Sequence, residues 1–289
     1  MTIAIVVHGG AGAWPIGSKR LARAVEVCSQ AATAGRELLA AGATAVAAVE
    51  AAVRVLEDDL LFNAGRGSHP TSDGNVEVDA MIMSGADLSL GAVAAVQRVQ
   101  NPISLARMVM EKTPHTFLAG AGAEQFADSS GFPRVSNAAL LPLARGETVD
   151  AHDTVGAVAL DAQGNIAAAT STGGIPNKMP GRIGDSPLVG AGAYAANESA
   201  AVSATGDGEA LMKILISKTA CDLVSGGASP QQACETALQM LTTRFDASAG
   251  LIALDPQGHV GVTCNSAAMP YAIAVDAEPI LRGHQPPSR

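Results

Sequence analysis

One threonine stands at the start of an apolar segment, in a setting that permits nucleophilic chemistry. Thr154 follows "HD" and opens the run "TVGAVAL". A threonine hydroxyl is a weak nucleophile unless a base removes its proton, and an N-terminal threonine can use its own α-amino group. That group titrates near about 7.7–8.0, which suits a base at neutral pH. Because Thr154 is internal, this chemistry requires cleavage of the bond between Asp153 and Thr154.

The simpler interpretation of Thr154 is structural, because threonine is favoured in strands. The segment before it, residues 129–153, has two prolines, two glycines and no periodic face, so we expect a loop or linker there. After it, the sequence predicts a strand, a turn over residues 161–165 and a second strand. Residues 250–265 repeat that design, with a turn over residues 255–259. An irregular segment that runs abruptly into a strand is the arrangement that cleavage would need.

Periodicity predicts the other elements. We expect helices over residues 18–41, 43–58, 102–112, 117–127, 209–224 and 231–244. Asn101 and Pro102 are typical of a helix start, and residues 229–232 have the form of a capping box. Further strands are expected within residues 3–8, 76–83, 91–97 and 200–206. Strands gather at both ends of the chain and helices between them, which favours an α+β protein with two stacked sheets flanked by helices.

Composition excludes several classes of function. The chain has 289 residues, is 48% hydrophobic and carries a net charge of −9 without a basic run, so we expect no nucleic-acid partner. No apolar stretch is long enough to span a membrane, and no signal-peptide pattern is present. Four scattered cysteines form no CxxC motif, which argues against a zinc site or a disulfide scaffold. We therefore expect a soluble cytoplasmic protein with reduced thiols and no membrane partner.

Long motifs resemble one known family. "HDTVGAVALDAQGNIAAATSTGG", "NKMPGRIGDSPLVGAGAYA" and "AVSATGDGE" are similar to the plant-type L-asparaginases and isoaspartyl peptidases, a family of N-terminal nucleophile hydrolases that includes glycosylasparaginase. "VVHGGAGAW", "VLEDDLLFNAGRGS" and "VEVDAMIMSG" resemble the same family. The similarity covers about residues 5–275.

The resemblance implies a fold and an activity. The fold is a single-domain, four-layer αββα sandwich of two mainly antiparallel sheets. Self-cleavage before Thr154 would give an α subunit, residues 1–153, and a β subunit, residues 154–289, assembled as a homodimer of αβ units. The freed threonine would attack the side-chain amide of L-asparagine or of a β-aspartyl dipeptide and form a β-aspartyl ester, which water then hydrolyses.

The resemblance also assigns roles around the nucleophile. Thr172 would lie at the same sheet end as Thr154, because a tight turn joins their strands, and its hydroxyl would hydrogen-bond that of Thr154. Asn63 would support the nucleophile. The Thr205 hydroxyl and the Gly206 N–H would form an oxyanion hole. Without the resemblance, Thr172 would be an ordinary strand-end residue and "TGDG" a turn.

Substrate binding is implied for a second set of residues. Arg182 resembles a clamp for the substrate α-carboxylate, and its planar guanidinium suits pairing at two points. Asp185 would accept from the α-ammonium, and Gly206 and Gly208 would line the substrate. An Arg–Asp surface pair has the same spacing and stabilises little.

The resemblance implies no catalytic cofactor but includes a structural sodium ion. Its ligands would be backbone carbonyls, since hard cations prefer oxygen. The carbonyls implied are those of Leu56, Glu57, Asp59, Phe62, Ala64 and Arg66.

Other functions stay open. Asp153 replaces the glycine usual in the asparaginase branch and matches glycosylasparaginase, so a hydrolase of the glycan–asparagine bond is an alternative. We hypothesise that the Asp153 carboxylate assists cleavage as a base or strains the scissile bond. A relative that no longer cleaves itself and only binds ligands is a further alternative. A phosphate-binding glycine loop is disfavoured, since GxxxxGK[ST] is absent.

Overall fold

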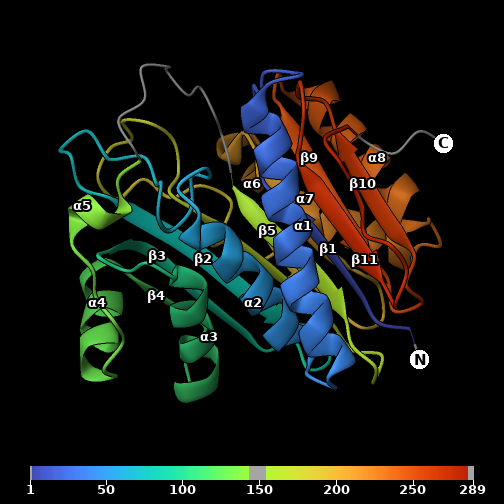
Figure 1. Cartoon of the computed structure of the whole chain (residues 1–289), viewed down its shortest axis with the longest axis horizontal. Coiled ribbons are helices and arrows are strands. Elements are labelled where there is room, and N and C mark those ends of the chain that lie inside the picture. Colours follow the sequence, from blue (N-terminus) through green and yellow to red (C-terminus); the bar gives the residue numbers. More distant parts are fainter. Residues whose placement is uncertain (1, 143–153, 286–289) are drawn as a thin grey trace.

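The chain folds into two stacked β-sheets between two layers of helices (Figure 1). The computed structural model describes residues 2–142 and 154–285. An eight-stranded sheet has the order β12-β11-β1-β5-β6-β2-β3-β4, and a four-stranded sheet the order β10-β9-β8-β7. The strands are β1 (Ala4–His8), β2 (Glu77–Ser84), β3 (Leu90–Gln97), β4 (Phe117–Ala119), β5 (Val155–Leu160), β6 (Ile166–Thr172), β7 (Ala193–Ala195), β8 (Ala201–Gly206), β9 (Ala249–Leu254), β10 (Val260–Cys264), β11 (Tyr271–Val275) and β12 (Leu281–Gly283).

Alternating side chains divide the core into layers. In β1, Ile5 and Val7 face the outer helices, whereas Ala4 and Val6 face the second sheet. The outer helices of the large sheet are α1 (Lys19–Ala40), α2 (Ala45–Asp58), α3 (Pro102–Lys112) and α4 (Gly120–Ser129). The small sheet is covered by α6 (Gly208–Ile214), α7 (Ile216–Ser225) and α8 (Pro230–Arg244). This α–β–β–α layering confirms the predicted fold class.

Several predicted helix starts are confirmed. The Ser18 side chain accepts from the Leu21 N–H at the start of α1, and Ser229 forms a capping box at the start of α8. Asn101 precedes α3 as predicted, but its side chain does not cap the helix. It donates instead to Glu57 and Asp58. The buried carboxylate of Glu57 accepts from the Ile103 N–H, so an acid from α2 takes the place of the expected cap.

Three predicted boundaries are wrong. Residues 117–119 form β4, which pairs in parallel with β3, so the helix expected from residue 117 begins at Gly120. The helix expected over 209–224 breaks at Leu215, which adopts a left-handed conformation between α6 and α7. The loop expected over 129–153 contains a short helix, α5 (Asn137–Leu140). Asp153 and the rest of residues 143–153 lie outside the described residues.

Strand register places both predicted threonines at one sheet end. β5 and β6 are antiparallel, with Val155 opposite Ser171, so Thr154 and Thr172 lie at the matching ends of these strands. β8 in the other sheet ends at Gly206. Within residues 2–142 and 154–285, no helix combines the length and the apolar character needed to cross a bilayer.

Candidate active site

A small pocket at this sheet end collects most of the predicted site residues. Its free volume is about 10 Å³, so its walls lie close together. The lining residues come from β5, β6, β8, the start of α6 and the loop after β6; they are Thr154, Thr172, Gly174, Ile175, Arg182, Gly184, Asp185, Ser186, Gly206 and Gly208. The structure therefore brings together six of the predicted residues, although they are spread over more than fifty positions of the chain.

Thr154 is a buried residue of the pocket wall. The residue is 6% exposed, and its Oγ lies 3.3 Å from the Ser186 Oγ. The expected partner, Thr172, instead accepts a hydrogen bond from the Gly174 N–H at 3.0 Å. Ser186 is fixed in turn, because its carbonyl accepts from the Thr170 hydroxyl at 2.7 Å. Sequence reasoning missed Ser186, although it directly follows Asp185 in "GRIGDSP".

Asn63 supports the backbone that follows Thr172. Its side-chain amide nitrogen donates to the Gly174 carbonyl at 2.5 Å, and its backbone carbonyl accepts from the Gly173 N–H at 2.7 Å. The side-chain oxygen of Asn63 accepts from the His69 N–H at 2.9 Å. Asn63 thus fixes the turn that leaves β6, and its hydrogen bonds among the described residues go to the backbone of Gly173, Gly174 and His69.

Arg182, the predicted clamp for a substrate carboxylate, binds the carboxylate of Glu209 from this chain. Arg182 donates to both oxygens of Glu209, at 2.8 Å from Nε and 2.6 Å from Nη2. The Arg182 side chain is 16% exposed and that of Glu209 is 53% exposed. The guanidinium therefore already binds a carboxylate at two points, the geometry expected for a substrate carboxylate. Sequence reasoning did not identify Glu209.

Asp185 is buried and keeps one oxygen without a partner. Its Oδ2 has no hydrogen-bond partner among the described residues. Burial raises the pKa of this carboxyl to about 7, while the nearby charge of Arg182 acts in the opposite direction. Gly208 lies against it, since a Cβ at that position would be 2.9 Å from Asp185 Oδ1. An unpartnered buried acceptor in a pocket wall is suited to a cationic donor such as an α-ammonium.

Of the two residues predicted to form the oxyanion hole, Gly206 lines the pocket, whereas its neighbour Thr205 in β8 does not. The Thr205 hydroxyl is fully buried and accepts from the Ala11 N–H at 3.2 Å. Gly206 has φ +139°, and a Cβ there would lie 2.2 Å from the Ser248 carbonyl oxygen, so a glycine is required. Gly206 also lines a second cavity, between the loop after β1 and residues 246–248 and 265–267. Because both cavities are lined by Gly206, the second cavity adjoins the pocket.

Asp207 follows the oxyanion candidates and begins a helix. Its side chain accepts from the Ala210 N–H at 3.4 Å, as the N-cap of α6. It also lines the adjoining cavity.

The loop predicted to hold sodium offers uncharged oxygen donors. It folds back on the end of α2, where the Glu57 carbonyl accepts from the Arg66 N–H at 2.8 Å. A Cβ at Gly67 (φ +89°) would lie 2.5 Å from the Phe62 carbonyl oxygen, which shows how closely the backbone is packed. In residues 2–142 and 154–285, no group of three His, Cys, Asp or Glu side chains could hold a metal ion. Three of the carbonyls predicted to bind sodium, those of Leu56, Glu57 and Asp59, accept hydrogen bonds from the N–H groups of Asp59, Arg66 and Phe62.

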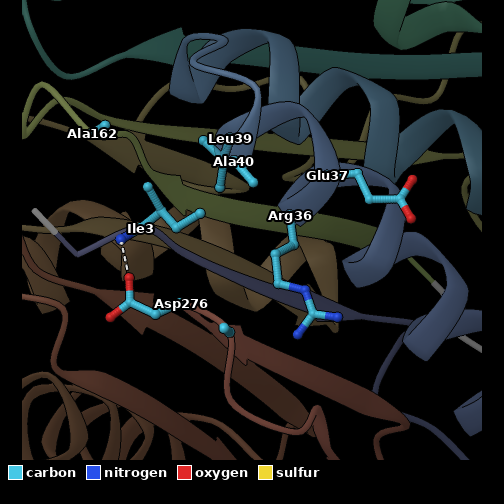
Figure 2. Close-up of a pocket in the computed structure, with 8 residues that line it drawn as sticks. Ile3, Arg36, Glu37, Leu39, Ala40, Ala162 and Asp276 are labelled. Carbon is cyan, nitrogen blue, oxygen red and sulfur yellow. Dashed lines mark hydrogen bonds between the residues drawn. The ribbon is translucent and has the colours of Figure 1, made fainter.

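Another cavity lies near the start of β1, beside Ile3 (Figure 2). Ile3 and Asp276 lie on one side of it, joined by a 2.8 Å hydrogen bond from the Ile3 N–H, and Arg36 and Glu37 of α1 lie on the other. None of the residues predicted to act in catalysis lines it.

Comparison with known proteins agrees with the fold. An αββα sandwich with a threonine at the start of an inner strand is the architecture of N-terminal nucleophile hydrolases. The sequence profile of the asparaginase family matches residues 1–150 and 142–280, and the chain belongs to this family.

Relatives match over nearly their full length. The mouse isoaspartyl peptidase/L-asparaginase is 46% identical over 287 residues, covering 94% of this chain and 88% of the relative. The human protein of the same name is 45% identical over 289 residues, covering 95% and 94%. The isoaspartyl peptidase of Escherichia coli strain K12 is 43% identical over 290 residues, covering 92% and 90%.

Proposed function

We propose that this chain is an amidohydrolase that releases L-aspartate from L-asparagine and from β-aspartyl dipeptides, with Thr154 as the nucleophile. The proposal rests on one observation: a buried hydroxyl, a guanidinium and a buried carboxyl line the same small pocket. An aspartyl group has a reactive carbonyl, an α-carboxylate and an α-ammonium, so each of its three polar ends has a matching partner. The names of the mouse, human and bacterial relatives support the same substrates.

The nucleophile is generated by self-cleavage in this proposal. The Thr154 hydroxyl attacks the carbonyl of Asp153, and the acyl group moves from nitrogen to oxygen. Water hydrolyses the resulting ester and leaves Thr154 with a free α-amino group. That group then serves as the base for its own hydroxyl.

Turnover follows in two steps. The Thr154 Oγ attacks the substrate amide carbon while the α-amino group takes the hydroxyl proton and passes it to the leaving amine. The negative charge on the carbonyl oxygen is stabilised by the Thr205 hydroxyl and the Gly206 N–H. Water, activated by the same amino group, hydrolyses the β-aspartyl ester and releases L-aspartate.

The substrate is oriented by charge. Arg182 binds the α-carboxylate, and Asp185 with the Gly208 backbone binds the α-ammonium. The amine of the leaving group departs past Gly206 into the adjoining cavity. Asparagine and β-aspartyl dipeptides share the aspartyl half and differ only on this leaving side.

Replacement of the nucleophile tests the proposal. We expect wild-type protein to separate on a denaturing gel into fragments 1–153 and 154–289, and Thr154→Ala to stay as one chain with no ammonia release from L-asparagine. Thr242→Ala, which removes an exposed threonine hydroxyl on α8, is the matched control and should cleave normally. Normal turnover by Thr154→Ala would show that another nucleophile acts.

Three substrates decide between the activities. Side-by-side assays with L-asparagine, β-Asp-Leu and a glycosylated asparagine give the relative kcat/KM for each leaving group. We expect the first two to be hydrolysed. Exclusive hydrolysis of the glycosylated substrate would favour a glycosylasparaginase, and an intact, inactive wild-type chain would favour a binding protein.

We also propose a structural sodium ion and a homodimer of αβ units. The carbonyls of Leu56, Glu57, Asp59, Phe62, Ala64 and Arg66 would hold the ion. Replacing sodium by tetramethylammonium should then lower Tm, and an unchanged Tm would remove the ion from the proposal. Sedimentation equilibrium should give twice the mass of one αβ unit, whereas a single-unit mass would exclude the dimer.

A further inference from the structure

A buried aspartate completes a row of side chains that starts at Thr154. In the antiparallel pair β2–β6, Asp79 lies directly opposite Thr172. In β5–β6, the register that places Val155 opposite Ser171 places Thr154 opposite Thr172. Directly opposed residues of antiparallel strands project from the same face, with Cβ atoms about 4.5–5.5 Å apart. Thr154, Thr172 and Asp79 therefore occupy neighbouring positions on three adjacent strands.

The shared face is the one between the two sheets. Met81 and Met83 lie two and four residues after Asp79 in β2, so they share its face of the sheet. They belong to the inter-sheet core, as do Ile166 and Ala168 of β6. Asp79 is thus turned inward toward the same layer as Thr172. It is fully buried.

The backbone is adapted to keep this carboxylate in place. The β2–β3 register shifts between Val78 and Ala80, and Ala95 on the opposite strand has φ +50°. This irregularity lets the Ala95 N–H donate to Asp79 Oδ1 at 2.7 Å. Asp79 Oδ2 is buried without a hydrogen-bond partner among the described residues. An irregularity that supplies a donor to one oxygen and leaves the other unpartnered indicates a functional position.

A buried lysine lies close enough to act on the charge of this aspartate. Lys178 is 3% exposed, and its Nζ donates to the Glu77 carbonyl at 2.9 Å. Burial raises the pKa of Asp79 to about 6, the charges of Lys178 and Arg182 act in the opposite direction, and Glu77 raises it further. Burial lowers the pKa of Lys178, while Asp79 and Glu77 raise it. The ammonium thus partly offsets the cost of burying the carboxylate.

The hydrogen bonds of Thr172 suggest a role for Asp79 as the acceptor of the Thr172 hydroxyl. Thr172 Oγ accepts from the Gly174 N–H, which occupies one of its two lone pairs. Its hydroxyl proton is left for another acceptor, and the unpartnered Oδ2 of Asp79 belongs to the residue directly opposite on the neighbouring strand. If that proton points to Asp79, the second lone pair of Thr172 is left for an N–H of the Thr154 α-amino group, which keeps its own lone pair for the Thr154 hydroxyl.

We infer that Asp79, supported by Lys178, is a positioning residue that directs the Thr172 hydroxyl so that Thr172 accepts a hydrogen bond from Thr154. The inference rests on the proposed function and adds to it a residue outside the pocket wall. This role involves no proton transfer. Asp79 acts through Thr172 and does not touch substrate.

A double-mutant cycle tests this role. Asp79→Asn keeps the size of the side chain but removes its charge, and we expect kcat on L-asparagine to fall about 10- to 100-fold with KM within about twofold. Thr172→Val removes the hydroxyl at nearly constant shape. If Asp79 acts through that hydroxyl, adding Asp79→Asn to Thr172→Val should cause no further loss of kcat, whereas Thr172→Ser should leave the Asp79→Asn effect intact.

The control is a buried aspartate at the other end of the sheet. Asp161 accepts from the N–H groups of Ala45, Gln163 and Asn165, so Asp161→Asn should lower Tm. Its effect on kcat should be small and additive with Thr172→Val. All kcat values are taken per cleaved chain, counted on a denaturing gel, so that slow maturation is not mistaken for slow turnover.

The outcomes separate the inference from the proposed function. Independent, additive losses from Asp79→Asn and Thr172→Val, or an unchanged kcat in Asp79→Asn, would overturn the positioning role while leaving the hydrolase in place. A wild-type chain that hydrolyses neither L-asparagine nor β-Asp-Leu would overturn the hydrolase itself. If Asp79→Asn does not fold, Lys178→Met replaces it in the same cycle, and its loss of kcat should also disappear in the Thr172→Val background.

Discussion

Arg182 and Glu209 form a two-point ion pair at the edge of the candidate active site. Both carboxylate oxygens of Glu209 accept from one guanidinium, at 2.8 and 2.6 Å. Arg182 lies in the loop after β6, whereas Glu209 lies in the first turn of α6 in the other half of the sandwich. A substrate carboxylate that binds this guanidinium must therefore displace Glu209 or share the guanidinium with it.

Removing the charge of Glu209 should tighten substrate binding. An ion pair with a half-exposed partner contributes about 0.2–1 kcal/mol, so we expect Glu209→Gln to lower KM for L-asparagine by about 1.4-fold to fivefold. Steady-state kinetics measures the change. Asp222→Asn, which breaks the exposed ion pair with Lys218, is the control and should leave KM unchanged. A higher KM in Glu209→Gln would mean that Glu209 mainly holds Arg182 in position.

The buried carboxyl of Asp185 should make substrate capture depend on pH. Its pKa is about 7, because burial disfavours the charged form. The ionised form is needed for an ammonium, so Asp185 should add a further fall of about tenfold per pH unit to kcat/KM for L-asparagine below about pH 7, on top of the fall caused by protonation of the Thr154 amino group. Succinamic acid lacks the ammonium group and should show only the fall caused by the Thr154 amino group. The same pH limb with both compounds would assign it to another group, such as the Thr154 amino group.

The same carboxyl should also affect stability. Its folded pKa of about 7 lies above the ordinary value of 3.8, so between these two pH values the folded protein holds a proton that the unfolded chain has lost. The contribution of Asp185 to the free energy of unfolding is therefore present at low pH and is lost as pH rises through this window. Comparing Tm of wild type and Asp185→Asn from pH 4 to 8 isolates this contribution. An identical pH dependence of Tm in the two proteins would contradict it.

Local patterns were sufficient to predict the central hairpin, whereas the roles of its two threonines came from the family resemblance. The turn at residues 161–165 fixes the register of β5 and β6, and register alone brings Thr154 and Thr172 to one sheet end. The N-caps of α1 and α8 could likewise be predicted from the sequence, because capping depends on residues within one turn.

Tertiary contacts account for what sequence reasoning missed. Residues 117–119 precede an alanine- and glycine-rich segment that continues the helical pattern, yet they pair with the edge of β3. Leu215 interrupts a helix without a local glycine or proline. The contacts of Ser186, Glu209 and Asp79 each join segments far apart in the chain, so no local pattern could reveal them.

A methyl group at Gly206 should damage both stability and catalysis. Its Cβ would lie 2.2 Å from the Ser248 carbonyl, and its φ of +139° is unfavourable for other residues. We expect Gly206→Ala to lower the free energy of unfolding by more than about 3 kcal/mol and to remove most of kcat. Gly227→Ala is the matched control, because Gly227 also has positive φ but no heavy atom within 4 Å of the added carbon. It should cost only about 1 kcal/mol. Equal losses in the two variants would show that backbone strain, and not the clash with Ser248, decides the cost.

The Thr205 hydroxyl should contribute to kcat and not to substrate binding. Its oxygen accepts from the Ala11 N–H at 3.2 Å, which fixes the oxygen and leaves the proton available as a donor. Negative charge develops on the substrate carbonyl oxygen only during reaction, so removal of this donor should affect the transition state. We expect Thr205→Ala to lower kcat by about 10²–10³-fold with little change in KM, and Thr205→Ser to restore most of the activity. A rise in KM at constant kcat would instead place Thr205 in ground-state binding, and failure of serine to restore activity would assign its role to the packing of its methyl group.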